Sequence, residues 1–564
     1  MVETKMEKDD IDDIDQLIIE DDPVQKGIWE PVKYQFRHLP VHVALLHTGK
    51  VLAFGGSGND ETRLTSPYSA EIFEPDMLLQ ETNERARADN FEEHSHEGNK
   101  KSDTPNGRVY EIPTEVDGDI FCSGHAFLPD GRLMIAGGTY KYDGKFLGLP
   151  VPPFSGLDHS YIFDPLKLRW NKCASMKNGR WYPTCISLPD GRVLAMAGLS
   201  KNFPWAFLNK LEVYTSDDAA GEWHNVVGGN HWVPMYPRLH LLPTGDIFYA
   251  GSYNTHYTFP FSLRSFPSAI YNIRTNKWTT IGNPNNIKRE EGTSVLLPLL
   301  PPDYVGRVLL IGGGTQSGTD AINDVEMIDF SDRHPRYKSI KPMKHARYYA
   351  YAILLPDQTV LVLGGKTGTK GHMMKNSKMN LSKESSTNLL TQGAISHDPH
   401  AVLELELYDL TTKKWHSMAS MKVDRLYHAN AILLPDGRVM ASGSNPDRRI
   451  NELRIEIYRP PYLFKGKRPT ISKFPKTILY GNEFEIETTD TGDIKSVALM
   501  RPSVTTHCVN TEQRYVGLEF TRKNSNLISS KVSFNRNVIP PGYYMLFLLS
   551  QNDVPSIGHF TCIA

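Results

Sequence analysis

HAFLPDGRLMIAGG at residues 125–138 and AILLPDGRVMASGS at residues 431–444 are two copies of the phrase that decides the fold. Each copy is an apolar run, a Pro-Asp-Gly turn, a second apolar run and then small residues. Proline presets φ, aspartate bonds to its own backbone and glycine tolerates positive φ, so the phrase predicts a β-hairpin. The phrase recurs with variations at 43–56, 185–198, 240–252, 294–314 and 352–365.

Each copy belongs to a longer unit. Most copies are followed by a tyrosine-bearing run and then a tryptophan-bearing run, as in SYIFDPLKLRWNKC at 160–173. Four strands per unit at a period of roughly 45–60 residues is typical of a kelch-type β-propeller blade. The seven copies predict an all-β ring of seven blades. The last copy lacks a clear fourth strand, and we expect GIWEPVKYQF at 27–36 to supply it and close the ring.

The repeat stops after Pro460-Pro461, where a different pattern begins. The last hundred or so residues hold short strand-like runs such as FEIETT and YYMLFLLS, which fit an immunoglobulin-like β-sandwich. At the other end, residues 1–24 carry ten Asp and Glu and predict a solvated, disordered tail. The predicted domains are an acidic tail at 1–26, a propeller at 27–464 and a sandwich at 465–564.

The composition excludes several classes of protein. With 62 Lys and Arg against 64 Asp and Glu, and a net charge of −2, the chain is no broadly basic nucleic-acid binder. Its five cysteines cannot all pair, and no apolar run reaches the length of a transmembrane segment. No export signal is visible, because Leu17-Ile18-Ile19 is too short to be one, so the default expectation is a cytoplasmic protein.

One position of the repeat carries reactive side chains. The innermost strand of a propeller blade lines the central channel, so equivalent positions form a ring around the axis. We expect that ring to contain the residues eight positions before each turn Asp, or before the Thr that replaces it: Cys122, Tyr182, Tyr236, Tyr349 and His428, the last with Tyr427 beside it. Val, Ile or Leu would be usual there, although a lone tyrosine is more often only a packed residue.

This set of side chains points to a metal. Imidazole and phenolate with a nearby thiol suit Cu(II), and the absence of a carboxylate cluster argues against magnesium or calcium. One more imidazole would complete a square site. Two polar inserts lie near 80–106 and 368–396. His94 and His96 in the first insert could also hold a metal, and the alternative is a solvated loop.

Four segments resemble the copper-radical oxidases, the galactose oxidase and glyoxal oxidase family. They are DIFCSGHAFLPDGR around Cys122, GRWYPTCISLPDGR around Tyr182, DRLYHANAILLPDGR around Tyr427-His428, and MRPSVTTHCVNTEQRYVGL around His507. The resemblance runs from about residue 27 to 564 and implies an early-set domain for the sandwich. The resemblance also allows an extracytoplasmic location as the alternative to a cytoplasmic one.

The resemblance implies a site and a reaction. Cys122 sulfur would be joined by a thioether to the ring of Tyr182, which would hold a radical. One copper per chain would be bound by Tyr182, Tyr427, His428 and His507, with Tyr427 as the general base. The expected activity is oxidation of a small alcohol or aldehyde, with O2 reduced to H2O2, by a monomer that needs no nucleic acid.

The sequence also departs from the family pattern. Galactose oxidase has a tryptophan over the thioether, and direct alignment places Ser200 there, with Trp205 close enough to substitute. Galactose specificity is therefore not implied. Tyr236 and Tyr349 are outer-sphere candidates or packing residues, and His125 either hydrogen-bonds near the site or fills its hairpin. The competing hypothesis is a non-catalytic kelch propeller that binds carbohydrate or protein.

Overall fold

The part of the chain described here comes from a computed structural model. It comprises residues 22–58, 70–76, 107–142, 145–146, 149–150, 154–202, 207–216, 220–251, 266–287, 289–314, 321–368, 398–445, 451–489 and 491–564. The insert at 80–106 with His94 and His96, nearly all of the insert at 368–396, Trp205 and the first 21 residues lie outside it. No helix in the described ranges is long and apolar enough to cross a membrane.

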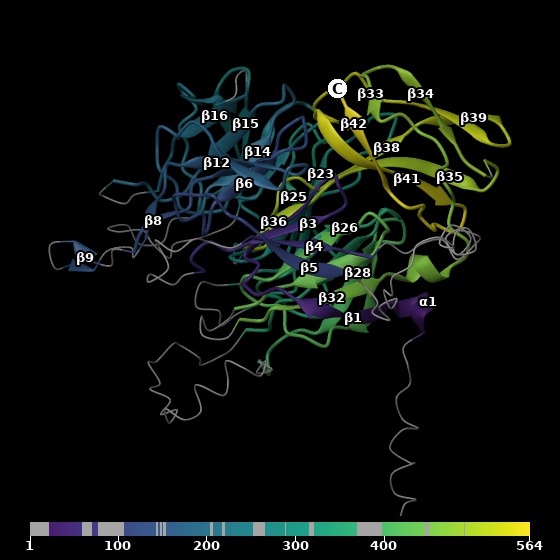
Figure 1. Ribbon diagram of the computed structural model, residues 1–564, viewed down its shortest axis with the longest axis horizontal. Helices are drawn as coiled ribbons and strands as arrows, with labels where there is room; N and C mark the ends of the chain where they lie inside the picture. Colours follow the sequence, from purple (N-terminus) through teal and green to yellow (C-terminus); the bar gives the residue numbers. More distant parts are fainter. Residues whose placement is uncertain are drawn as a thin grey trace, which may run out of the picture.

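Seven antiparallel sheets form the four-stranded blades of a propeller, in chain order except in blade seven, whose outer strand is β1 (Figure 1). Blades one to three are β2 (His42–Leu45), β3 (Val51–Phe54), β4 (Ala70–Glu74), β5 (Arg108–Ile112); β6 (Gly124–Phe127), β7 (Leu133–Ala136), β12 (Ser160–Asp164), β13 (Arg169–Lys172); and β14 (Thr184–Ser187), β15 (Val193–Met196), β16 (Leu211–Thr215), β17 (Glu222–Asn225). Blades four and five are β18 (Leu239–Leu241), β19 (Ile247–Tyr249), β20 (Ser268–Asn272), β21 (Lys277–Gly282); and β22 (Thr293–Leu296), β23 (Arg307–Ile311), β24 (Val325–Asp329), β25 (Tyr337–Ile340). Blades six and seven are β26 (Tyr351–Leu354), β27 (Val360–Leu363), β28 (Glu404–Asp409), β29 (Lys414–Ser420); and β30 (Asn430–Leu433), β31 (Val439–Ser442), β32 (Arg454–Arg459), β1 (Ile28–Gln35).

The predicted closure of the ring is confirmed. Strand β1 from the N-terminal side pairs antiparallel with β32, with Trp29 opposite Tyr458 and Ile28 opposite Arg459. Around the axis, the innermost strands of neighbouring blades contact one another, as β6 does with β14 and β26 with β30. The inner strand β14 is covered by a blade on either side and is buried along its whole length, whereas the outer strand β17 buries only Trp223.

A buried Arg–Glu pair fixes the loop that enters the inner strand in four blades. The pairs join that loop to the third strand: Arg180 with Glu212, Arg289 with Glu326, Arg347 with Glu406 and Arg425 with Glu456. In blade three the distance is 2.7 Å, and neither side chain is exposed. Arg180 also donates to the carbonyl of Ala197. The residue two or three positions after each arginine is thereby fixed in place at the channel.

The C-terminal region is the expected β-sandwich (yellow-green in Figure 1). One sheet has the order β33 (Thr477–Ile478), β42 (His559–Ile563), β41 (Gly542–Ser550), β35 (Ile494–Arg501), β38 (Arg514–Leu518), and the other β34 (Glu483–Glu487), β40 (Leu527–Lys531), β39 (Phe520–Asn524). Its core is continuous with that of the propeller, because Val497 and Leu546 share one apolar cluster with Leu296 and Val308. The two units are therefore packed together.

The remaining elements are short. Helix α1 (Pro23–Lys26) is capped by Asp22, and a 3-10 turn at Pro461–Phe464 follows the last blade. Strand β8 (Thr139–Lys141) pairs with β11 (Ser155–Gly156), and β9 (Lys145–Phe146) with β10 (Leu149–Pro150). A hairpin of β36 (Val504–Thr506) and β37 (Val509–Asn510) leaves the sandwich and adds to blade one, where Thr505 lies opposite Val43.

Candidate metal centre

One backbone conformation recurs where the chain enters the inner strand. Six blades have a non-glycine residue with left-handed φ there: Cys122 (62°), Tyr182 (64°), Tyr236 (43°), Glu291 (49°), Tyr349 (68°) and His428 (60°). Such a conformation costs about 1–2 kcal/mol for a residue with a Cβ, so its recurrence points to function rather than folding. We call these six residues the axial ring.

Backbone hydrogen bonds connect the axial ring from blade to blade. The N–H of Tyr182 donates to the carbonyl of Cys122 at 3.0 Å, and the N–H of Tyr236 donates to that of Tyr182 at 2.9 Å. In the same way, the N–H of Tyr349 donates to the carbonyl of Glu291 at 2.8 Å. These bonds involve four of the five residues that the repeat placed on the ring, and the fifth, His428, has a ring nitrogen within 4.8 Å of Cys122 Sγ.

Sequence reasoning missed Glu291, the sixth ring residue. Counting back from the turn fails in blade five, because its hairpin has the longer connection LPPDYVG. The start of the inner strand would have found it, since Glu291 stands two residues before β22 (Thr293–Leu296), as Tyr349 does before β26 (Tyr351–Leu354). Blade one has Pro40 at this position, and proline cannot adopt a left-handed φ.

Five reactive side chains meet at one point of the axis. The phenol oxygens of Tyr182 and Tyr427 lie 2.5 Å apart, and the rings of Tyr427 and His428 stack with centroids 3.9 Å apart. Ligand atoms of Cys122, His428 and His507 all lie within 4.8 Å of one another, and these three residues are buried. The residues predicted for the site therefore come together, although they are up to 385 positions apart in the chain.

The hairpin β36–β37 carries His507 to this point from the C-terminal sandwich. Thr506 Oγ1 donates to the carbonyl of Val41 at 3.0 Å, so it accepts from Nδ1–H of His507 at 2.6 Å. That bond fixes the tautomer and leaves the lone pair of His507 Nε2, which lies 3.8 Å from Cys122 Sγ. Thr505 Oγ1 donates to Asn430 Oδ1 and holds the hairpin against blade seven.

Two protein-family models match this chain, and together they cover the propeller and the sandwich. The family model described as Glyoxal oxidase N-terminus matches residues 41–462, and the one described as Galactose oxidase-like, Early set domain matches residues 468–563. The chain belongs to the glyoxal oxidase family. The predicted family and fold are both confirmed by these matches.

Several relatives of this glyoxal oxidase family member have names that describe oxidases. The chain is 27% identical over 486 residues to the aldehyde oxidase GLOX of Vitis pseudoreticulata, covering 79% of this chain and 82% of that protein. It is 23% identical over 467 residues to galactose oxidase of Gibberella zeae, covering 78% and 60%. A solved fungal alcohol oxidase in complex with copper shares its fold with a TM-score of 0.71 at 20% identity, over 96% of this chain and 100% of that one.

The side chains of this glyoxal oxidase family member fit a copper ion. Burial lowers the pKa of His507 well below its usual value, and neighbouring His428 lowers it further, so the imidazole is neutral and able to ligate. Burial, with the charge of Cys122, raises the pKa of the Tyr182 and Tyr427 phenols. A divalent ion between these two half-buried phenols and the neutral imidazoles would favour the ionised form of the phenols.

Two further histidines form a hydrogen-bonded chain that ends at the backbone of Cys122. His42 Nε2 accepts the backbone N–H of Cys122 at 3.1 Å, so its Nδ1–H donates to Nε2 of His125 at 2.8 Å. His125 therefore hydrogen-bonds near the site, rather than merely filling its hairpin. Sequence reasoning missed His42, because it is the first residue of β2 and stands two positions after Pro40, the ring position of blade one.

A tryptophan covers the ring of Tyr182, but it is Trp181. The two rings stack with centroids 4.0 Å apart and planes 8° apart, and Phe154 stacks on the other face of the indole at 4.2 Å. Ser200, which alignment placed in this role, instead donates to the carbonyl of Asn202. The sequence did signal this tryptophan, because Trp181 directly precedes Tyr182 in the segment GRWYPT.

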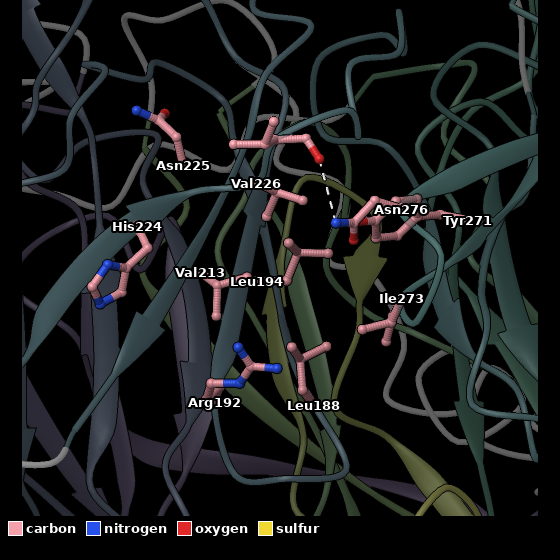
Figure 2. Close-up of a pocket in the computed structure, with 11 residues that line it drawn as sticks. Leu188, Arg192, Leu194, Val213, His224, Asn225, Val226, Tyr271, Ile273 and Asn276 are labelled. Atoms are coloured by element: carbon pink, nitrogen blue, oxygen red, sulfur yellow. Dashed lines mark hydrogen bonds between the residues drawn. The ribbon is translucent and has the colours of Figure 1, made fainter.

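A cavity of about 410 Å³ lies away from the axis, between blades three and four (Figure 2). Its base is apolar, with Leu194 and Val213 on it, and its polar groups bond to the chain itself. Arg192 is paired with Asp190, and Asn276 donates to the carbonyl of Val227 and accepts from Tyr271. No reactive or metal-binding cluster of the described residues lies there, so the chemistry belongs to the axis.

Proposed function

We propose that this protein is a mononuclear copper, tyrosyl-radical oxidase that converts a small alcohol or aldehyde to an aldehyde or acid and reduces O2 to H2O2. One observation carries the proposal. Two phenol oxygens 2.5 Å apart share the propeller axis with a thiol and two imidazoles whose ligand atoms lie within 4.8 Å. A binding module has no need of that set in a buried position. The oxidase names of the relatives support the same conclusion.

The proposal assigns a role to each of these residues. Tyr182, Tyr427, His428 and His507 would hold the copper, and Cys122 would be joined to the ring of Tyr182 through a thioether. Copper, when bound, supplies a one-electron acceptor and a Lewis-acidic position for the substrate oxygen. The second one-electron acceptor is Tyr182, because a sulfur substituent makes its phenol ring easier to oxidise.

The protein side chains handle the protons and the hydrogen atom. Tyr427 accepts the proton of the substrate hydroxyl at its phenol oxygen as general base. Oxidised Tyr182 takes a hydrogen atom from the carbon that bears that hydroxyl. The substrate thereby loses two electrons and two protons, which O2 carries away as H2O2. Trp181 and Tyr236, stacked at 4.0 and 4.5 Å on the ring of Tyr182, shield it from solvent while it is oxidised.

The decisive experiment is copper loading under O2, followed by intact-mass analysis and peptide mapping. We expect a Cys122–Tyr182 cross-linked peptide that is lighter by two hydrogens than the separate peptides. Cys122→Ala should form no cross-link and give little peroxide, whereas Cys562→Ala, which removes a half-buried thiol from the sandwich, should behave as the parent does. Separate Cys122 and Tyr182 peptides after loading would reject the radical mechanism.

A further inference from the structure

Only part of the metal centre is open to solvent. Cys122, His428 and His507 are at most 5% exposed, and Tyr236 is 8% exposed. By contrast, Tyr182, Tyr427, Tyr349 and Glu291 are only half-buried. Tyr349 and Glu291 therefore lie on the exposed side of the axial ring, together with Tyr182 and Tyr427.

Glu291 is bound into this side of the ring through its backbone. Its carbonyl accepts the N–H of Tyr349 at 2.8 Å, and the ring of Tyr349 packs on Tyr427 with centroids 5.1 Å apart. Tyr349 is therefore the residue that links Glu291 to Tyr427, the tyrosine that we assign as general base. Burial raises the pKa of the Glu291 carboxyl to about 7, and the charge of Arg238 opposes that rise.

The side chain of Glu291 differs from the buried glutamates of the neighbouring blades, which are paired with arginines. No ion pair of Glu291 with a Lys, Arg or His is found in the described ranges. Arg238 is the nearby positive charge, but its guanidinium donates to the carbonyls of Gly292, at 2.6 and 2.9 Å, and of Arg289, at 3.2 Å. Arg238 therefore holds the loop that carries Glu291 through backbone carbonyls, while Glu291 itself stays half-buried.

We propose that Glu291 selects the substrate: the site takes small alcohols or aldehydes whose non-reacting end donates a hydrogen bond, a hydroxyl or an ammonium group, and rejects those that end in a carboxylate. The inference rests on the proposed oxidase function. A donor at the far end of the substrate would bind the carboxylate while the reacting oxygen lies by Tyr427 and Tyr182. Above pH 7, where Glu291 with its pKa of about 7 is mainly ionised, a second carboxylate beside it would instead be repelled, because like charges in a half-buried place are poorly screened.

Four alcohols of equal length test the proposal: ethane-1,2-diol, 2-aminoethanol, propan-1-ol and glycolate. The copper-loaded parent should show a kcat/KM at least about tenfold higher for the two hydrogen-bond donors than for glycolate. Glu291→Gln should lose about tenfold for 2-aminoethanol and gain for glycolate, and Glu291→Asp should keep the parent order. Glu222→Gln removes a carboxylate that is 60% exposed on β17 and should change nothing.

Calorimetric binding of the same four compounds, with and without copper, separates this inference from the proposed function. If the parent makes neither cross-link nor peroxide but binds 2-aminoethanol in preference to glycolate, and Glu291→Gln loses that preference, the oxidase function fails and the selectivity stands. If charge has no effect on binding or kcat/KM in the parent, or Glu291→Gln keeps the parent order in a folded protein, the role of Glu291 is overturned.

Discussion

The indole of Trp181 lies flat on the phenol ring of Tyr182, with centroids 4.0 Å apart and 8° between the planes. These are adjacent residues, and side chains of adjacent residues in a strand point to opposite faces. The left-handed φ of 64° at Tyr182 breaks that alternation. Tyr182 is thereby enclosed between Trp181 and Tyr236 and remains open at its edge, where its hydroxyl meets Tyr427.

We expect Trp181→Leu to shorten the lifetime of the oxidised Tyr182. Loss of the stacked ring removes an aromatic contact of about 0.5–1.5 kcal/mol and admits water to one face, so peroxide output should fall about tenfold. Copper affinity should not change, because the indole offers no ligand. The measurement is the decay of the radical absorbance and EPR signal after oxidation by one electron.

Trp278→Leu is the matched control for Trp181. Trp278 also stacks on a ring, that of His231 at 4.2 Å, but it lies in blade four on the outer strand. This variant should leave the radical lifetime unchanged. Equal lifetimes in Trp181→Leu and the parent would mean that stacking has no part in keeping Tyr182 oxidised.

Much of this centre was predictable because a propeller repeats its geometry. The repeat alone put Cys122, Tyr182 and His428 at equivalent positions, and equivalence around one axis means proximity. Glu291 was missed because its hairpin has an insertion, which shifts a count made from the turn without moving the inner strand. The pairing of β36 with β2 is not part of the blade repeat. Only the family resemblance could therefore predict that His507 lies at the axis.

We expect His42→Phe to slow formation of the thioether. The N–H of Cys122 would lose its acceptor in a buried place, which costs about 1–3 kcal/mol and frees Cys122 from its fixed conformation. The measurement is the fraction of chains lighter by two hydrogens against time after copper and O2 are added. His42→Gln, which can still accept that N–H, should recover much of the parent rate. Equal rates in His42→Phe and the parent would remove His42 from this role.

His240 should make the fold sensitive to acid. Burial, reinforced by Arg514 and Arg238, lowers its pKa from 6.5 to about 3, so the folded chain does not take up the proton that the unfolded chain binds. The free energy of unfolding should therefore fall as pH falls from 6.5 towards 3, with this histidine contributing up to about 1.4 kcal/mol per pH unit.

His240→Gln should remove that contribution. Glutamine can keep the hydrogen bond to Ser294 Oγ, which is 2.8 Å long, but it cannot take up a proton. Urea unfolding of both proteins over this pH range gives the comparison, and the variant should show a slope smaller by about one proton. If the two slopes are the same, His240 titrates normally in the folded chain.

The buried pair of Arg180 and Glu212 should be the strongest single support of the loop before Tyr182. Arg180→Met leaves the carboxylate of Glu212 buried without its partner, and the free energy of unfolding should fall by about 3–5 kcal/mol. The double variant Arg180→Met, Glu212→Leu should recover only part of the lost free energy of unfolding. Glu212 Oε1 also accepts the N–H of Lys177, and that donor would then be left unsatisfied.

The exposed pair of Arg108 and Glu74 is the control for that of Arg180 and Glu212. Its side chains are 69% and 33% exposed, so Arg108→Met should cost less than about 1 kcal/mol. Arg180 stands two residues before Tyr182, so its loss should also lower the yield of the Cys122–Tyr182 cross-link. The contrary result is that Arg180→Met loses no more stability than Arg108→Met and still gives a full yield of cross-link. That result would show that the axial ring holds its conformation without the pair of Arg180 and Glu212.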